Sequence, residues 1–317
     1  MIIPRYCGAV VGAGFVVVAG FFAAGAAGFA VPRPDEASRR SNKPVPPFRI
    51  AGNVYYIGAI EIGSYLITTP QGHFLLDGGF VETAPQIEHN IEQLGFRLKD
   101  VRILVNSHAH FDHAGGLAEL KKLTGAKFLA SEGDAQLPRN GGHGDFRFGD
   151  TLVFPPINPD QIIHDGEAIQ LGDQILIAHL TPGHTRGNTT WTTQIRDGNK
   201  TYNVVFVGSQ SSLDYKFVGQ ESYPGIMADF ERSFVTLNHL LATFSSPPME
   251  ACFISKRNTN VRGAAMPLPS SIPTATSNIC RKARRNSGTK SHARSCKPPQ
   301  IETVKRESEP SIDTNGA

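Results

Sequence analysis

The chain has 317 residues, of which 40% are hydrophobic, so it is long enough for one large or two ordinary domains with a sizeable core. Its formal net charge of +3 is unevenly distributed, because 12 of the 31 Lys/Arg and only 4 of the 28 Asp/Glu lie in residues 251–317. The other 19 basic and 24 acidic side chains leave residues 1–250 with a net charge of −5. We therefore expect no nucleic acid among its partners.

Residues 1–30 predict a cleavable signal peptide. Arg5 precedes a run rich in Gly, Ala, Val and Phe, and the small residues Gly28 and Ala30 follow that run. An uncleaved membrane anchor is the alternative, because the run is long enough to span a bilayer. In both cases the folded part lies outside the cytoplasm, so we expect a periplasmic or secreted protein. Once the signal is cleaved, no stable membrane partner is expected.

Residues 31–47 are polar and rich in proline, which is typical of a linker, and the domain is predicted to begin near Phe48. Short apolar stretches bounded by turn residues predict strands, whereas apolar residues at helical spacing predict helices. The predicted strands lie at residues 48–58, 64–70, 73–79, 101–107, 126–131 and 202–209, and residues 173–195 are predicted to form a strand, a turn and a second strand. The predicted helices lie around residues 83–96, 117–123 and 229–241. Because strands and helices do not alternate strictly, the order indicates an α/β (α+β) class with mixed sheets flanked by helices.

The chain changes character after about Leu241. Residues 241–317 show neither the period of 3.6 that is typical of a helix nor the period of 2 that is typical of a strand. This segment is predicted to be a disordered tail. The domain is therefore expected to span residues 48–240.

A cluster of metal-ligand side chains follows the predicted buried strand at residues 101–107. His108, His110, Asp112 and His113 form the pattern His-x-His-x-Asp-His. If the chain leaves the strand extended, His108 and His110 point the same way and can reach one metal ion. Asp112 and His113 lie past the bend and can face a second ion. Imidazole and carboxylate ligands favour zinc. The alternative is a set of histidines on a solvated loop.

A further ligand is expected from the segment TPGHTRGNTTW. His184 follows a Pro-Gly turn at a strand end, where its side chain can project from the rim of a sheet into a cleft. Taken alone, this residue would be an ordinary turn histidine. Beside the preceding motif it is the natural third ligand.

These segments resemble the metallo-beta-lactamase superfamily of zinc hydrolases over roughly residues 48–240. The stretches LLDGG at 75–79, GHTRGNTTW at 183–191 and VGSQSSLDYKFVGQESYPGIMADFERSF at 207–234 are similar to subclass B3 metallo-beta-lactamases. The resemblance implies an αββα sandwich of two mixed β-sheets flanked by helices, with two zinc ions. It implies that the first zinc is held by His108, His110 and His184, and that Asp112 and His113 hold part of the second.

The resemblance also implies roles for residues outside this ligand set. Subclass B3 uses only His and Asp ligands and carries a serine where relatives have a metal-binding Cys or a bridging Asp, and that position matches Ser209. Ser209 and Ser211 would help to anchor a substrate carboxylate. Asp77 would orient a ligand histidine through its ring N–H.

The implied reaction is hydrolysis of the beta-lactam ring of antibiotics. Zinc lowers the pKa of bound water to about 7 and so supplies a hydroxide, which Asp112 would orient. One alternative is a lactone or thioester substrate on the same fold, although the thioesterase branch prefers an aspartate at the Ser209 position. Another is a non-enzymatic zinc-binding remnant or pseudogene product. The sequence does not determine the preferred lactam or the oligomeric state.

One ligand that the resemblance requires is missing. The family places a third protein ligand of the second zinc, a histidine, on a late strand. After His184 the only histidines are His239, on the predicted helix, and His292, in the tail. The sequence therefore firmly supports one zinc and leaves the second short of a ligand.

Residues 243–253, TFSSPPMEACF, supply that histidine when they are read in another frame. If each codon starts on the third base of a written codon, the stretch can encode Ile-Leu-Phe-Ser-Ala-His-Gly-Gly-Met-Leu, a strand followed by a histidine. Residues 269–282 can likewise encode a stretch that resembles the family's closing helix and the segment before it. We infer that residues from about 239 onward are an out-of-frame translation, so the written chain lacks the last strand and helix. An unrelated disordered extension is the alternative.

Overall fold

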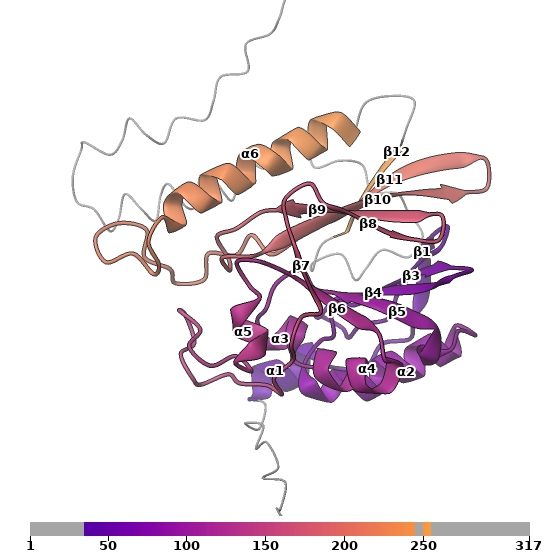
Figure 1. Ribbon diagram of the computed structural model, residues 1–317, viewed down its shortest axis with the longest axis horizontal. Helices are drawn as coiled ribbons and strands as arrows, with labels where there is room; N and C mark the ends of the chain where they lie inside the picture. Colours follow the sequence, from indigo (N-terminus) through magenta and orange to yellow (C-terminus); the bar gives the residue numbers. More distant parts are fainter. Residues whose placement is uncertain (1–34, 245–249, 255–317) are drawn as a thin grey trace, which may run out of the picture. The chain divides into compact units, whose positions relative to one another are not determined.

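The computed structural model describes residues 35–244 and 250–254, and these contain two β-sheets with helices on their outer faces (Figure 1). The signal peptide predicted at residues 1–30 lies outside the described residues. So does the predicted tail from residue 255 onward.

The first sheet is mixed and has seven strands in sequential order. Its first four strands pair antiparallel, whereas β4 to β7 pair in parallel, so that the C-terminal ends of β4, β5 and β6 lie at one edge. The strands are β1 (Phe48–Ala51), β2 (Val54–Tyr56), β3 (Tyr65–Thr69), β4 (Gly72–Leu76), β5 (Val101–Val105), β6 (Lys127–Ser131) and β7 (Gln161–Ile163).

The second sheet has five strands in the order β12-β11-β10-β9-β8. Its pairs are antiparallel except that β12 runs parallel to β11. The strands are β8 (Ala168–Leu171), β9 (Gln174–Leu180), β10 (Thr189–Asp197), β11 (Lys200–Phe206) and β12 (Glu250–Ile254).

Strand β4 shows how the sequence builds apolar cores on both sides of the first sheet. All five of its residues are buried, and successive side chains point to opposite faces. Phe74 and Leu76 pack in the cluster that also contains Trp191 of β10, between the two sheets. Leu75 packs in the cluster that contains Ile87 and the helices of the outer face.

Helices α2 (Ala84–Gln93) and α4 (Leu117–Thr124) cover the outer face of the first sheet, and α6 (Ile226–Phe244) lies on the outer side of the second (Figure 1). Helix α2 has a proline in its first turn and buries residues three or four positions apart, which is the spacing of one helical face. The short helices are α1 (Glu36–Ser41), η1 (Val81–Thr83), η2 (Leu98–Asp100), α3 (Phe111–Ala114) and α5 (Gln136–Arg139). This helix–sheet–sheet–helix order confirms the predicted αββα sandwich.

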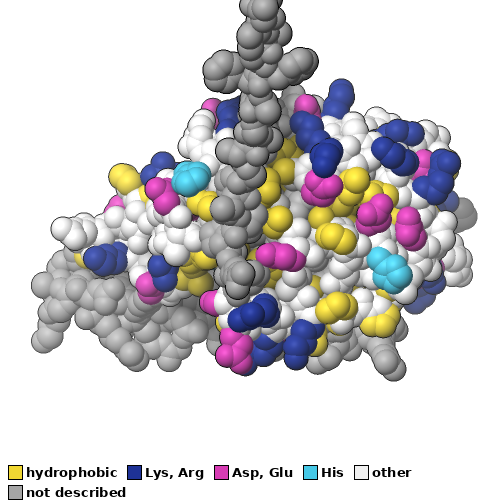
Figure 2. Space-filling model, turned by 90° about the horizontal axis from the view of Figure 1, so that it is seen from below, with side chains coloured by type: hydrophobic (Ala, Val, Ile, Leu, Met, Phe, Trp, Pro, Cys, Tyr) yellow, Lys and Arg dark blue, Asp and Glu magenta, His cyan; other side chains and the backbone are white. Residues whose placement is uncertain are grey.

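The face that carries α2 and α4 is a mixed polar surface. Figure 2 shows Lys and Arg side chains interspersed with Asp and Glu, and apolar side chains scattered between them. Side chains of opposite charge in this arrangement are typical of a solvated surface.

The segment predicted as a linker at residues 31–47 differs from that prediction in its described part. It contains α1, and the Thr83 hydroxyl donates a hydrogen bond to Asn42 Oδ1 at 2.7 Å. The backbone N–H of Glu61 donates to the Ser41 carbonyl at 3.1 Å. The polar composition predicted a mobile arm, but side-chain and backbone groups of this segment form hydrogen bonds with the domain.

The predicted tail also differs in part, because α6 extends to Phe244 and residues 250–254 form β12. Strand β12 pairs with β11 from Tyr202↔Glu250 to Phe206↔Ile254. The physical reason is that β11, which pairs with β10 on one side only, would otherwise present unpaired backbone N–H and C=O groups, and β12 satisfies them. The written chain was expected to lack a last strand, but residues 250–254 form a strand parallel to β11.

Among the described residues, the structure contains no helix that is both long and apolar enough to cross a membrane.

Candidate metal centre

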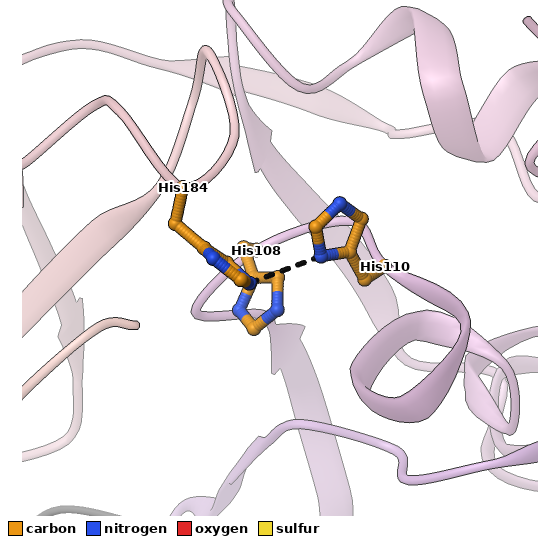
Figure 3. Close-up of side chains that lie close together, drawn as sticks. All are labelled: His108, His110 and His184. Atoms are coloured by element: carbon orange, nitrogen blue, oxygen red, sulfur yellow. Dashed lines mark hydrogen bonds between the residues drawn. The ribbon is translucent and has the colours of Figure 1, made fainter. Parts of the chain in front are cut away.

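The predicted ligands meet where loops from the two sheets face each other. His108 and His110 follow the C-terminal end of β5, and Asp112 and His113 lie in α3. His184 lies in the loop between β9 and β10 of the second sheet. Figure 3 shows the rings of His108, His110 and His184 turned toward a common point. The C-terminal edge of parallel strands is a usual position for a functional site.

One group of ligand atoms comes from His108, His110 and His184, whose atoms lie within 4.8 Å of one another. All three side chains are buried, and His110 Nδ1 lies 3.1 Å from His184 Nε2 (Figure 3). Two nitrogen ligands at zinc–nitrogen distances of about 2.0–2.1 Å in a tetrahedral site lie roughly 3.3 Å apart. The spacing of these two atoms therefore fits a shared metal ion.

The orientation of His184 is set by its second ring nitrogen. His184 Nδ1 lies 2.6 Å from the carbonyl oxygen of Ser211. Because a carbonyl can only accept, Nδ1 carries the proton in this contact, and the lone pair of the neutral ring is then on Nε2. Nε2 is the atom that faces His110, so the tautomer suits metal binding.

A second group consists of His108, Asp112 and His113. His113 Nδ1 lies 2.7 Å from Asp77 Oδ2, and Asp77 also accepts hydrogen bonds from the backbone N–H of Ser107 at 2.6 Å and from its hydroxyl at 2.7 Å. Within the described part of the chain, Nε2 of His113 is buried without a hydrogen-bond partner. A buried nitrogen acceptor of this kind, 3.7 Å from Asp112 Oδ2, is what a bound cation would satisfy.

Asp77 has a φ of 64°, in the left-handed region that residues other than glycine rarely adopt. Backbone strain of this kind costs on the order of 1–3 kcal/mol and persists only where the surroundings hold it. The three contacts of the carboxylate to Ser107 and His113 supply that constraint. Asp77 thus contacts His113, one of the predicted ligands.

The structure places the remaining predicted residues as follows. Ser209 and Ser211 lie in the loop after β11, where Ser209 Oγ accepts from the backbone N–H of Ser211 at 3.4 Å. The Ser211 hydroxyl accepts from the backbone N–H of Leu213, also at 3.4 Å. His239 is exposed on α6 and belongs to neither ligand group, and His292 lies outside the described residues.

Two acidic residues next to the site were not predicted from the sequence. Asp145 Oδ2 lies 3.4 Å from His110 Nε2, and both side chains are almost fully buried. Burial raises the pKa of Asp145, but its contacts with His110 and the backbone N–H groups of Phe148 and Arg147 outweigh burial and hold that pKa below the usual value. Asp145 is therefore an anion that faces a predicted ligand.

Asp134 is the other residue that was not predicted. Its buried carboxylate accepts hydrogen bonds from the backbone N–H groups of Ala109 and Gly187 and from the hydroxyl of Thr185. Burial raises the pKa of Asp134, and these donors offset part of that effect. In the sequence, Asp134 and Asp145 stand in a Gly/Pro/Asp-rich stretch where aspartates are usually turn residues, so no local signal distinguishes them.

This fold, with its two overlapping groups of potential metal ligands, is that of a superfamily of metallo-hydrolases. The model of the metallo-beta-lactamase superfamily matches residues 61–198. FEZ-1 metallo-beta-lactamase from Legionella gormanii is 42% identical to the chain, over 62% of this chain and 77% of that one, with a TM-score of 0.61. LRA-12, a class B3 di-zinc metallo-beta-lactamase from an Alaskan soil metagenome, is 32% identical over 80% of this chain and 96% of that one, with a TM-score of 0.65. The chain belongs to the metallo-beta-lactamase superfamily.

A curated relative points to another substrate. The hydroxyacylglutathione hydrolase of Maricaulis maris is 33% identical over 108 residues, which is 34% of this chain and 34% of that enzyme. The chain therefore matches about a third of the length of this relative. The similarity supports the shared metallo-hydrolase fold and leaves the substrate open.

Proposed function

We propose that this protein is a zinc-dependent hydrolase that opens the beta-lactam ring of antibiotics. The metal-dependent hydrolysis is supported by the pair of overlapping ligand groups that share His108. The observation that carries the lactam substrate is similarity, because the chain is 42% identical to one metallo-beta-lactamase and covers 96% of the length of another. The similarity to hydroxyacylglutathione hydrolase extends over only 34% of that enzyme.

Zinc is the proposed metal because imidazole and carboxylate ligands suit it. His108, His110 and His184 would hold the first ion, and His113 with Asp112 would hold part of a second. A bound zinc ion would supply a Lewis acid and an acidified water molecule.

The side chains around this site would orient the reactants. The Asp112 side chain is 18% exposed, against 5% for His113, so its carboxylate can meet a water molecule that enters from solvent. Asp112 would accept a hydrogen bond from that water and align it with the lactam carbonyl. Ser209 and Ser211 would hold the carboxylate of the substrate through their hydroxyls.

Thioester hydrolysis is the second candidate, and the match to hydroxyacylglutathione hydrolase favours it. Both reactions require an activated water at an acyl carbon, so the ligand groups alone do not separate them. The discriminating residues lie in the loop after β11, where Ser209 stands. A serine cannot replace an aspartate as a bridging ligand, which favours the lactam.

The full chain, purified with its metal counted, tests this proposal. Nitrocefin, a carbapenem and a hydroxyacylglutathione thioester are offered to the same preparation. We expect lactam hydrolysis, one tightly bound zinc and a second that binds weakly, because only Asp112 and His113 would serve the second ion. Turnover of the thioester alone would favour the second candidate, and bound zinc with no turnover would identify a non-enzymatic remnant. Two equally tight zinc ions would contradict the incomplete second site.

Export is a separate proposal, and it rests on residues 1–30. Cell fractionation of a C-terminally tagged chain should place a shortened form in the periplasm or the medium. Recovery of only the intact form from the cytosol would contradict it.

A further inference from the structure

The first ligand group depends on two loops that belong to different sheets. His108 and His110 follow β5 of the first sheet, whereas His184 lies between β9 and β10 of the second. The chain between His110 and His184 is long, so its local conformation cannot set the distance between their rings. Other contacts have to hold the two loops in register.

Asp134, between β6 and α5, contacts both loops at once. Its Oδ2 accepts from the backbone N–H of Ala109 at 2.9 Å, and Ala109 is the residue between His108 and His110. The same oxygen accepts from the Thr185 hydroxyl at 2.7 Å, and Oδ1 accepts from the backbone N–H of Gly187 at 2.8 Å. One carboxylate thus joins the residue between two ligands to the residues that follow the third.

The turn that carries Asp134 is itself fixed against the loop of His184. The Ser131 hydroxyl donates to the carbonyl of Gly187 at 2.6 Å. A Cβ on Gly187 would lie 2.2 Å from Ser131 Oγ, and a Cβ on Gly133 would lie 2.4 Å from the carbonyl oxygen of Arg186. The two backbones approach as closely as glycine permits, so the position of Asp134 relative to this loop has little freedom.

We propose that Asp134 is a positioning residue that sets the distance between the His108–His110 pair and His184, and thereby the metal affinity of that group. The inference rests on the proposed metal site. It adds a residue that contacts neither metal nor substrate and acts through the backbones of the two ligand loops.

The chemistry of the carboxylate makes this role specific to an acidic side chain. Asp134 offers two acceptor atoms to three donors, two of which are backbone N–H groups. In Asp134→Asn one of those atoms becomes an NH₂ group. If it replaces Oδ1 it faces the N–H of Gly187, and if it replaces Oδ2 it faces the N–H of Ala109. Either placement leaves one loop with a buried, unpaired donor, while the volume of the side chain is unchanged.

The test is a titration of the metal-free full chain with Co²⁺, for wild type and for Asp134→Asn. The visible absorption of the bound ion reports how much Co²⁺ is bound. We expect the affinity of the tight site to fall on the order of 10- to 100-fold, as for other residues that orient ligands. The absorption bands should shift with it. Asp160→Asn is the matched control, because Asp160 also accepts a backbone N–H, that of Phe128 near the start of β6, at 2.7 Å and away from the ligands.

Thermal unfolding of the metal-free variants separates positioning from general stability. Both variants should still unfold cooperatively, Asp160→Asn with the smaller fall in unfolding temperature because Asp160 is more exposed, and only Asp134→Asn should lose Co²⁺ affinity. Equal affinities for the two variants would overturn the positioning role. If Asp134→Asn does not fold, Thr185→Val, which removes only the hydroxyl contact, decides by the same readout, with a smaller expected loss. Unchanged affinity in that variant would then overturn the role. A wild-type chain that binds no Co²⁺ would overturn the metal site as well.

Discussion

The two ligand groups of the centre differ in how the chain brings their members together. His108, Asp112 and His113 lie within six consecutive residues, and the turn from β5 into α3 is enough to gather them. His108 and His110 follow a strand of the first sheet, whereas His184 belongs to a loop of the second. His184 follows His110 by 74 residues in the sequence. The first arrangement is local, and the second requires the whole sandwich to pack.

This difference has a consequence for metal binding. The local group keeps its geometry wherever the β5–α3 turn forms, but its ligand number is limited to what one short segment offers. The non-local group has three imidazoles, yet its geometry depends on Asp134 and on the contacts between loops. The local group should therefore be weak because a ligand is missing, and the non-local group should be sensitive to changes in packing.

The largest expected effect comes from His110, which belongs only to the non-local group. His110→Ala removes one of three ligands of the proposed first ion, whose Lewis-acid stabilisation is worth several kcal/mol. Lactam hydrolysis should fall on the order of 1000-fold in kcat/KM, together with the bound metal. His143→Ala, in an exposed histidine of a neighbouring loop, is the control and should retain activity. Retained activity in His110→Ala would show that the local group alone suffices.

The second-largest effect is expected from restoring the reading frame, which should raise the affinity of the local group for its metal ion. Structural zinc sites with four ligands are worth about 10–16 kcal/mol, so one histidine contributes roughly 3 kcal/mol, or on the order of 100-fold in affinity. The protein expressed from a gene corrected near codon 238 should bind the second metal ion more tightly by that factor, as measured by metal titration. The corrected chain with the restored histidine changed to alanine is the control.

The nucleotide sequence of the gene checks the same proposal without protein. In the shifted frame, the last base of the codon for Pro248 and the first two bases of that for Met249 should spell a histidine codon. Any other codon there would refute the proposed frameshift.

Asp77→Asn should weaken the local group more than the other, because Asp77 contacts His113 directly and reaches the shared His108 only through Ser107. Asparagine tolerates the positive φ of 64° at this position, so the backbone can stay in place. The amide replaces a charged acceptor of His113 Nδ1 by a neutral one, and the affinity for the second ion should fall at least about 10-fold. Co²⁺ titration measures both sites in one experiment. An equal loss at the two sites would contradict the division between the groups.

The smallest expected effect concerns the loop after β11, which contacts the non-local group through the carbonyl of Ser211. Ser209→Ala should raise KM a few-fold, corresponding to roughly 1 kcal/mol for one lost hydrogen bond, and leave kcat nearly unchanged. Ser212→Ala in the same loop is the control. A fall in kcat without a change in KM would place Ser209 in the chemical step instead.

The fold class and the local ligand group could be predicted from the sequence because their signals are short in range. The continuous apolar run of a buried strand such as β4 and the spacing of His108, Asp112 and His113 are both readable within a few residues. His184 was predicted as well, but only because the earlier motif raised the expectation of another ligand. By itself, a histidine after a Pro-Gly turn is ordinary.

Only the tertiary structure decided which groups hold those ligands in place. Asp134 meets Ala109 across 25 residues and Thr185 across 51, and Asp145 reaches His110 from a different loop. An aspartate in a turn has the same local sequence whether its carboxylate faces water or two buried backbone donors. Burial and hydrogen-bond partners arise when the sheets pack, so the order and spacing of the His and Asp residues determined the kind of site, and the packing of the two sheets determined its geometry.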